Sequence, residues 1–199
     1  GVILYFSDDI SRKKDKMQTF RQGILPYVVI LGVIALLMML EPHLSGTVLI
    51  LGIGAVLMLV GGIRWKWVGG VLLLAAVGAY LVLGVMGYGH SRLSMWLNPW
   101  LDAQGDGYQM VQSYLAIGSG GLLGVGLGKS RQKYLYLPEE HNDFIFAVVC
   151  EELGLIGAAL IMLLFAALVL RGYWIALNAR DRFGSLLAVG ITTLIAMQT

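Results

Sequence analysis

The chain has 199 residues, of which 58% are hydrophobic and only 13% are charged, and its formal net charge is +2. Soluble domains carry about 25% charged residues, so this composition excludes an ordinary cytosolic enzyme and a disordered tail. The small net charge excludes a nucleic-acid-binding module, and the single cysteine, Cys150, excludes a disulfide framework. The 27 glycines are typical of closely packed membrane helices. The sequence therefore predicts an all-α, polytopic integral membrane protein.

Stretches without charged residues locate the spans, because a helix needs about 20 mostly apolar residues to cross a bilayer. The predicted spans are Ile24–Leu40, Leu44–Ile63, Trp67–Tyr88, a long helix joining Phe144–Cys150 to Leu153–Leu170, and Phe183–Thr199. Gly1–Phe6 is apolar and is predicted to end a further span. We expect one transmembrane domain, residues 1–199, with five to six spans, truncated at both ends and inactive alone.

The basic residues orient these spans, because Lys and Arg concentrate in cytoplasmic loops. Three groups are predicted to be cytoplasmic: Arg12, Lys13, Lys14, Lys16 and Arg21; Arg64 and Lys66; and Arg171, Arg180 and Arg182. The basic residues left on the outer side are Arg92, Lys129, Arg131 and Lys133.

Gly107–Gly128 has no charge and is long enough to span the membrane. If it spanned, two groups of basic residues would exchange sides and the balance would be unchanged, so charge does not decide. Its many glycines, with Gln109 and Gln112, argue against a span, because irregular backbone needs cover from protein or water. We therefore expect residues 89–142 to form one long extracytoplasmic loop.

Residues 129–143 are the most polar part of that loop, with three cations followed by three carboxylates. Basic residues outside the cell suggest a phosphate-bearing ligand; a solvated loop with internal ion pairs is the alternative. Asp143 directly precedes an apolar helix, so it is either an N-cap or a general base whose pKa is raised by partial desolvation and nearby carboxylates. Glu151 and Glu152 lie within the same helix. They are expected either to face a cavity or a partner, or to lie at a shallow membrane depth that water reaches.

Other candidate motifs are weaker. Gly124–Gly128 alternates glycine with apolar residues but lacks the spacing and the βαβ context of a nucleotide-binding loop. His43, His90 and His141 show no metal-ligand spacing, so we expect no structural metal site. Cys150 is predicted to be a small packed residue.

Several motifs together closely resemble the SEDS family of peptidoglycan polymerases (FtsW, RodA, SpoVE). They are Gln132-Lys133, Tyr136-Leu137-Pro138-Glu139, His141-Asn142-Asp143-Phe144-Ile145-Phe146-Ala147 and Glu151-Glu152-Leu153-Gly154, with Asn98-Pro99-Trp100, Gly107-Tyr108-Gln109, Gln112-Ser113 and Glu41-Pro42-His43-Leu44-Ser45-Gly46 before them. Two positions depart from the family pattern: His43 replaces a common Asp, and Asn142 stands where Thr is frequent. The Tyr-Leu-Pro-Glu-x-His form is more similar to the FtsW/SpoVE branch than to RodA.

The resemblance implies ten spans in the full protein, in a bacterial cytoplasmic membrane, with Gly107–Gly128 outside the spans. It also implies a reaction: lipid II is polymerised into glycan strands at the outer face, for cell division or a related wall-synthesis process. A sugar 4-hydroxyl attacks the anomeric carbon of a second lipid II, and undecaprenyl pyrophosphate leaves. Asp143 matches the family's essential carboxylate. The substrate-binding candidates are Lys129, Arg131, Gln132, Lys133, Glu139 and His141, with Lys133 favoured for the pyrophosphate.

The same resemblance implies a class B penicillin-binding protein as the transpeptidase partner. A divalent cation, Mg²⁺ or Mn²⁺, is a further candidate cofactor, although no convincing ligand set can be read from the sequence. Two other function classes stay open: a lipid II flippase, which needs polar groups across the membrane depth, and a scaffold for the penicillin-binding protein, which would tolerate loss of Asp143.

Overall fold

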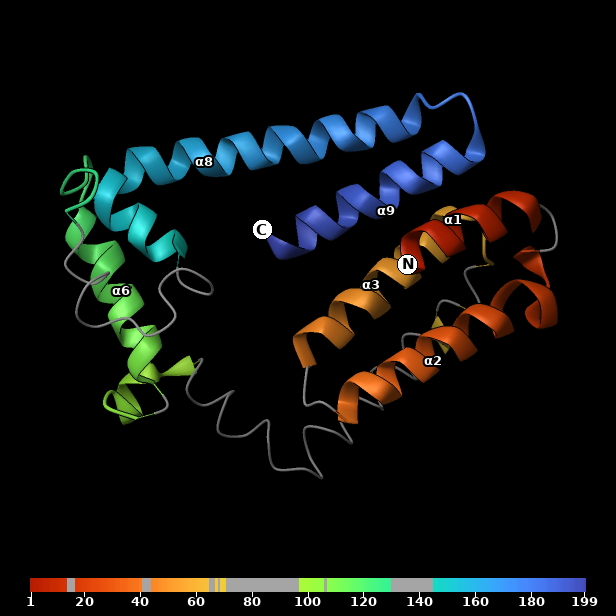
Figure 1. The fold of residues 1–199 in the computed structure, drawn as a ribbon, viewed down its shortest axis with the longest axis horizontal. Coiled ribbons are helices and arrows are strands. Elements are labelled where there is room, and N and C mark those ends of the chain that lie inside the picture. Colours follow the sequence, from red (N-terminus) through yellow and green to blue (C-terminus); the bar gives the residue numbers. More distant parts are fainter. Residues whose placement is uncertain are drawn as a thin grey trace. The chain divides into compact units, whose positions relative to one another are not determined.

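The computed structural model describes residues 1–13, 17–40, 44–64, 67, 69–70, 97–105, 107–129 and 145–199. These residues form helices joined by turns (Figure 1), so the described part of the chain is all-helical, as predicted. The chain divides into two compact units. Unit 1 consists of Gly1–Leu73 and Phe165–Thr199, and unit 2 consists of Leu74–Leu164.

Two apolar helical segments are long enough to cross a membrane. Phe20–Met38, which includes the π-helical turn η2 (Phe20–Ile24) and most of α2 (Leu25–Leu40), has 19 residues, and α8 (Ile145–Leu177) has 33. Helices α3 (Leu44–Val60) and α9 (Arg182–Gln198) are apolar and have 17 residues each. The predicted helices in these four regions are confirmed, whereas the predicted span Trp67–Tyr88 lies almost wholly outside the described residues.

Helix α1 (Val2–Lys13) continues beyond the apolar run Gly1–Phe6 through a polar segment. Two ion pairs support this extension: Arg12 Nε lies 2.9 Å from Asp8 Oδ1, and Lys13 Nζ lies 2.6 Å from Asp9 Oδ2. Both pairs join residues four apart with the acid nearer the helix N-terminus, which is the favourable order on a helix surface. The cations also lie in the last turn, where they complement the helix dipole.

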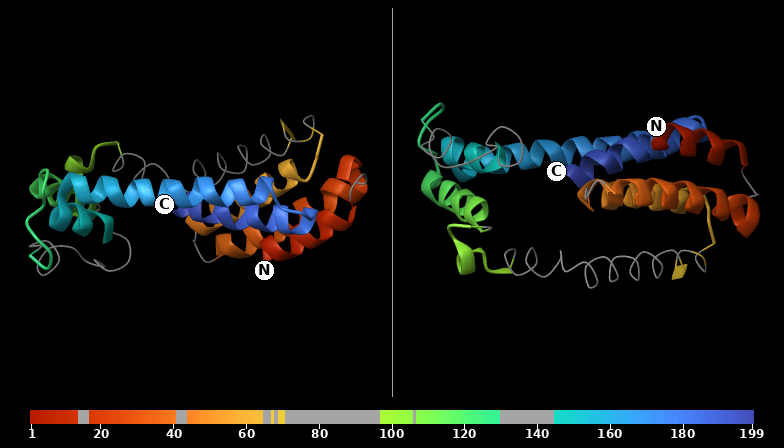
Figure 2. Two further views of the ribbon diagram at one scale, coloured as in Figure 1. Left: turned by 90° about the horizontal axis from the view of Figure 1, so that it is seen from above. Right: turned by 60° about the horizontal axis from the view of Figure 1, so that its bottom comes forward.

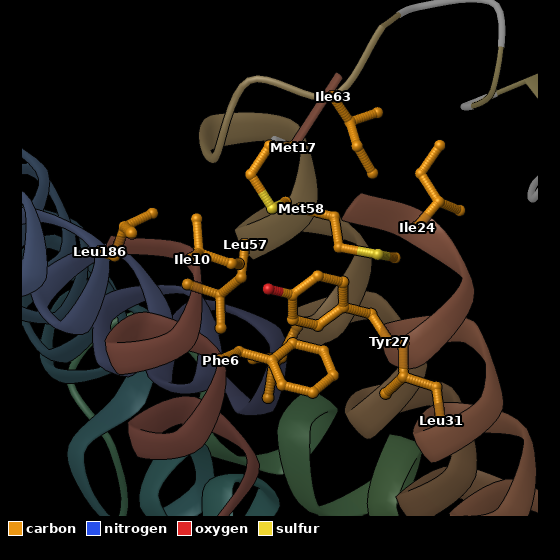
Figure 3. Close-up of a cluster of buried hydrophobic side chains, with 11 residues drawn as sticks. Phe6, Ile10, Met17, Ile24, Tyr27, Leu31, Leu57, Met58, Ile63 and Leu186 are labelled. Carbon is orange, nitrogen blue, oxygen red and sulfur yellow. The ribbon is translucent and has the colours of Figure 1, made fainter. Parts of the chain in front are cut away.

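The core of unit 1 is an apolar cluster contributed by α1, α2, α3, α9 and the segments between them (Figure 3). The rings of Phe6 and Tyr27 meet edge to face with their centroids 4.9 Å apart. The buried members of the cluster are Phe6, Ile10, Met17, Ile24, Tyr27, Leu31, Ile53, Leu57, Met58, Ile63 and Leu186. Side chains from four helices therefore hold this unit together.

Tyr27 also carries a polar contact from α2 to α1, because its hydroxyl donates to Asp9 Oδ2 over 2.6 Å. Burial raises the pKa of Asp9, but hydrogen bonds from Lys13 and Tyr27 and the charges of Lys13 and Arg12 outweigh burial and lower it. The carboxylate that closes this contact is therefore held in its charged form.

The N-terminus of α9 is fixed against α3 and the end of α8. Asp181 caps α9 by accepting a hydrogen bond from Gly184 N over 2.7 Å. Arg182 Nη2 donates to Gly61 O, just after α3, over 2.8 Å, and Ser185 Oγ donates to Ala176 O over 2.7 Å. These bonds bring two of the predicted basic loops, near Arg64 and near Arg182, to one end of unit 1.

Helices α1 and α9 pack on α3 in the same unit, and the two further views show α9 running alongside α3 (Figure 2). Gly61, which follows α3, lies so close to α1 that a Cβ there would be 2.7 Å from Ile10 Cγ2. The end of α1, with its basic residues, thus lies at the same end of unit 1 as Gly61. This arrangement is the one required if the three basic loops share one side of a membrane.

Unit 2 contains the 3-10 helix η3 (Pro99–Asp102), helix α6 (Tyr108–Gly120) and the first part of α8. Helix α6 has 13 residues, which corresponds to about 20 Å at 1.5 Å per residue, less than the roughly 30 Å of a bilayer core. It ends at Gly120 and is followed by the C-cap residue Gly121, whose φ is +53°. The uncharged run Gly107–Gly128 therefore does not form one continuous helix of spanning length.

Candidate active site

The structure describes one of the predicted site residues, Lys129. Its side chain is exposed, and its backbone N–H donates to Gly126 O over 3.1 Å. The other predicted site residues lie outside the described residues: Arg131, Gln132, Lys133, Glu139, His141 and Asp143. The base and N-cap interpretations of Asp143 therefore stay predictions. The structure does describe the segments on either side of the loop that carries these residues.

The loop is followed in the sequence by α8, and this helix is broken at Gly154. Gly154 has φ +67° and ψ −171°, a combination that is essentially restricted to glycine. Figure 1 shows the direction of α8 changing sharply near its start. A break of this kind frees backbone groups, because Leu155 N and Ile156 N no longer bond to Glu151 O and Glu152 O as they would in a regular helix.

The segment after α6 satisfies all four of these freed groups. Leu155 N donates to Gly121 O over 2.9 Å, and Ile156 N donates to Leu122 O over 3.2 Å. In the reverse direction, Val125 N donates to Glu151 O over 2.9 Å, and Gly126 N donates to Glu152 O over 3.1 Å. We call this pairing of residues 120–126 with residues 150–156 the glycine clamp.

The clamp requires glycine at three positions because the two backbones touch. A Cβ at Gly124 would overlap Glu152 O, and one at Gly154 would overlap Gly124 N. A Cβ at Gly120 would overlap Cys150 O. Gly124 also has φ +78°, which disfavours any side chain. No residue larger than glycine fits at these places without moving backbone.

The two glutamates of α8 lie within the clamp. Glu151 is only 2% exposed and is not without a partner. Glu152 is partly buried, and its Oε1 has no hydrogen-bond partner among the described residues. These positions favour an enclosed environment over a shallow water-reached one. Cys150 is buried with a free thiol, as expected for a packed residue.

Sequence reasoning identified the glycines of residues 118–128 as evidence against a span but missed their pairing with α8. The available signal was the alternation of Gly124, Gly126 and Gly128 together with a lone glycine, Gly154, after two glutamates in an apolar helix. Neither signal indicates a partner by itself. Within the described residues, no group of three or more His, Cys, Asp or Glu side chains is placed to hold a metal ion.

Comparison with known proteins relates the whole chain to one family. A profile of the FtsW/RodA/SpoVE family, described as "Cell cycle protein", matches residues 1–199. "Probable peptidoglycan glycosyltransferase FtsW" of Geobacter sulfurreducens (strain DL-1 / KN400) is 43% identical over 200 residues, which cover 100% of this chain and 53% of that protein. "Stage V sporulation protein E" of Bacillus subtilis (strain 168) is 43% identical over 201 residues, covering 100% and 54%.

A third relative, "Probable peptidoglycan glycosyltransferase FtsW" of Legionella pneumophila subsp. pneumophila (strain Philadelphia 1), is 37% identical over 201 residues, covering 100% of this chain and 51% of that protein. The chain thus spans about half the length of the curated relatives it matches. These names agree with the FtsW/SpoVE form of the motif near Asp143.

Proposed function

Because the chain belongs to the FtsW/RodA/SpoVE family of cell cycle proteins, we propose that this protein is a peptidoglycan glycosyltransferase. It polymerises lipid II into glycan strands at the outer face of a bacterial cytoplasmic membrane, during cell division or a related wall-synthesis process. The observation that carries the proposal is the match over the whole chain to relatives named probable peptidoglycan glycosyltransferase, at 43% identity. The two helical segments of membrane length support a location in the membrane.

The polar run that begins at Lys129 carries the groups that this reaction needs. The 4-hydroxyl of one lipid II attacks the anomeric carbon of another, a new glycosidic bond forms, and the bond to undecaprenyl pyrophosphate breaks. Asp143 accepts the hydroxyl proton as general base. Lys133, with Arg131 and Lys129, stabilises the negative charge on the departing pyrophosphate.

The remaining candidates bind the substrate around this centre. Gln132, Glu139 and His141 provide hydrogen-bond donors and acceptors for the sugars or the pyrophosphate. A divalent cation, Mg²⁺ or Mn²⁺, is proposed as an additional stabiliser of the leaving group, and a class B penicillin-binding protein is proposed as the partner that cross-links the strands.

The test of this function is synthesis from purified lipid II by the purified full-length protein, with and without its class B partner. Glycan strands of several disaccharides are expected in both samples, because the proposed chemistry uses groups of this protein alone. If lipid II stays unpolymerised in both samples while the protein translocates it across vesicles, the flippase alternative holds. If strands form only when a partner supplies its own polymerase activity, the scaffold alternative holds.

The proposed location of the loop gives a separate prediction. Cysteines placed at Gln104 and Ser130, in a Cys150→Ala background, are expected to react with a membrane-impermeant thiol reagent in intact spheroplasts. Both positions react because residues 89–142 lie outside the cytoplasm, and α6 between them is too short to cross the bilayer. Labelling at Gln104 without labelling at Ser130 would show that the chain crosses the membrane between them.

A further inference from the structure

We propose that the glycine clamp is a positioning device for the loop that carries Asp143. This inference rests on the proposed function, because it assigns the clamp a role in that reaction. Gly124 and Gly154 are its positioning residues: they do not touch substrate, and they act through the carboxylate.

The loop that carries the candidate site residues is anchored at both ends in the same clamp. On its N-terminal side, Lys129 follows Gly126 by three residues and donates its backbone N–H to Gly126 O. On its C-terminal side, Ile145 begins the helical segment that reaches Glu151, a rise of about 9 Å at 1.5 Å per residue. Four hydrogen bonds between these two ends close the loop at its base.

Asp143 lies two residues before the start of α8. A change in the direction of the segment from Ile145 to Leu153 therefore moves the point at which the chain leading to Asp143 joins α8. This direction is set at Gly154, because the break there separates the segment from the rest of α8. The clamp bonds to Glu151 O and Glu152 O fix the segment on one side of the break, and the bonds from Leu155 N and Ile156 N fix the other side.

This kind of anchoring suits a general base. Proton transfer requires the carboxylate to lie within hydrogen-bond reach of the attacking hydroxyl, and a displacement of about 1 Å can cost roughly 100-fold in rate. Gly124 and Gly154 meet through backbone atoms and have no side chains that could repack. A single methyl group added at either position therefore displaces backbone directly. The clamp is thus a place where a small change far from the substrate alters the geometry of catalysis.

Three substitutions in the full-length protein test the proposal. Gly154→Ala adds a methyl group against Gly124 N and Leu122 O at a backbone conformation that alanine disfavours. Gly126→Ala is milder, because its Cβ would be 3.4 Å from Lys129 Cδ and would meet no backbone, although φ is +105°. Gly118→Ala is the control: it lies in α6, is exposed and has nothing within 4 Å of its Cβ.

We expect Gly154→Ala to lower kcat for lipid II polymerisation by about 100-fold, with KM changed less than about threefold. Gly126→Ala is expected to give a smaller fall in kcat, about tenfold, and Gly118→Ala to stay within about twofold of the parent protein. Normal kcat in both clamp variants overturns the proposal. Gly126→Ala keeps the test valid if Gly154→Ala does not reach the membrane.

A double-mutant cycle separates positioning from a general loss of structure. If the clamp acts through the carboxylate, Gly154→Ala lowers the residual rate of an Asp143→Asn protein by less than about twofold. If the same substitution lowers that residual rate by the full 100-fold, the clamp acts on something other than Asp143 and the proposal is wrong.

A readout that does not need activity distinguishes failure of this inference from failure of the proposed function. In a Cys150→Ala background, the thiol of Asp143→Cys is treated with a small soluble thiol reagent. Adding Gly154→Ala or Gly126→Ala is expected to change the reaction rate at least threefold, and adding Gly118→Ala to leave it unchanged. Equal rates in all of these proteins contradict the positioning role, whether or not lipid II is polymerised.

Discussion

Replacement of Asp143 by asparagine is expected to lower the rate of glycan-strand synthesis by about 10²–10⁴-fold, the range attributed to general-base catalysis. An amide has nearly the size of the carboxylate but does not take up the proton of the attacking hydroxyl. Asparagine is also about as good an N-cap as aspartate, so the amount of folded protein in the membrane is expected to stay the same. The measurement is the initial rate of lipid II polymerisation per molecule of purified protein.

Glu139→Gln and Glu140→Gln are the matched controls, because each removes a negative charge from the same polar run. They are expected to lower the rate less than Asp143→Asn does, since neither is the proposed base. If Asp143→Asn is folded and keeps near-normal strand synthesis, the base assignment is wrong and the capping interpretation of Asp143 stands.

Phe6→Ala is expected to destabilise unit 1 by about 3–5 kcal/mol, the range for truncating a buried phenylalanine. Phe6 is 0% exposed and its ring packs edge to face on Tyr27 (Figure 3). The substitution leaves a cavity among α1, α2 and α3 and removes an aromatic pair. Within a membrane protein this cost comes from lost packing contacts, because lipid is as apolar as the core.

Leu4→Ala is the matched control on the same helix. Leu4 is 56% exposed, so its truncation opens no cavity in the cluster and is expected to cost less than about 1 kcal/mol. The measurement is unfolding in detergent micelles, compared among the three proteins. Equal stability of Phe6→Ala and the parent protein would show that the α1 contacts with α2 and α3 do not hold the unit together.

Much of the helical architecture follows from local rules. Uncharged apolar runs predicted α2, α3, the long helix α8 and α9, because a helix that crosses a bilayer needs about 20 mostly apolar residues and satisfies its own backbone groups. Helix α1 extends beyond its apolar run because Asp8 and Asp9 pair with Arg12 and Lys13. The i, i+4 spacing of these acidic and basic residues is visible in the sequence. It could have predicted that α1 extends beyond its apolar run.

The break at Gly154 is a different case, because its cause is not local. Glycine is common in membrane helices, so Gly154 alone does not predict a kink. The break is stable only because Gly121, Leu122, Val125 and Gly126 supply the missing hydrogen-bond partners. The hydropathy of residues 120–126 and of residues 150–156 does not predict that the two segments pair.

The candidate site likewise has one part that the sequence predicts and one part that depends on tertiary pairing. The motif around Asp143 predicts a chemistry from the sequence alone, because the residue types and their order resemble one family. The support beneath that motif required the structure, since the clamp is made of backbone atoms and its only side-chain signature is glycine. Glu151 illustrates the limit: its position in an apolar helix indicated an enclosed group or a shallow one, and its 2% exposure favours the former.

The most direct test of the account is sided polymerisation in vesicles that contain the full-length protein in one known orientation. Lipid II is supplied either to the leaflet on the side where Ser130 is labelled or to the opposite leaflet, and strand formation is measured together with translocation. We predict strands from lipid II on the Ser130 side, none from the opposite side and none with Asp143→Asn. Translocation of lipid II without strand formation, or equal synthesis by Asp143→Asn, would contradict the account.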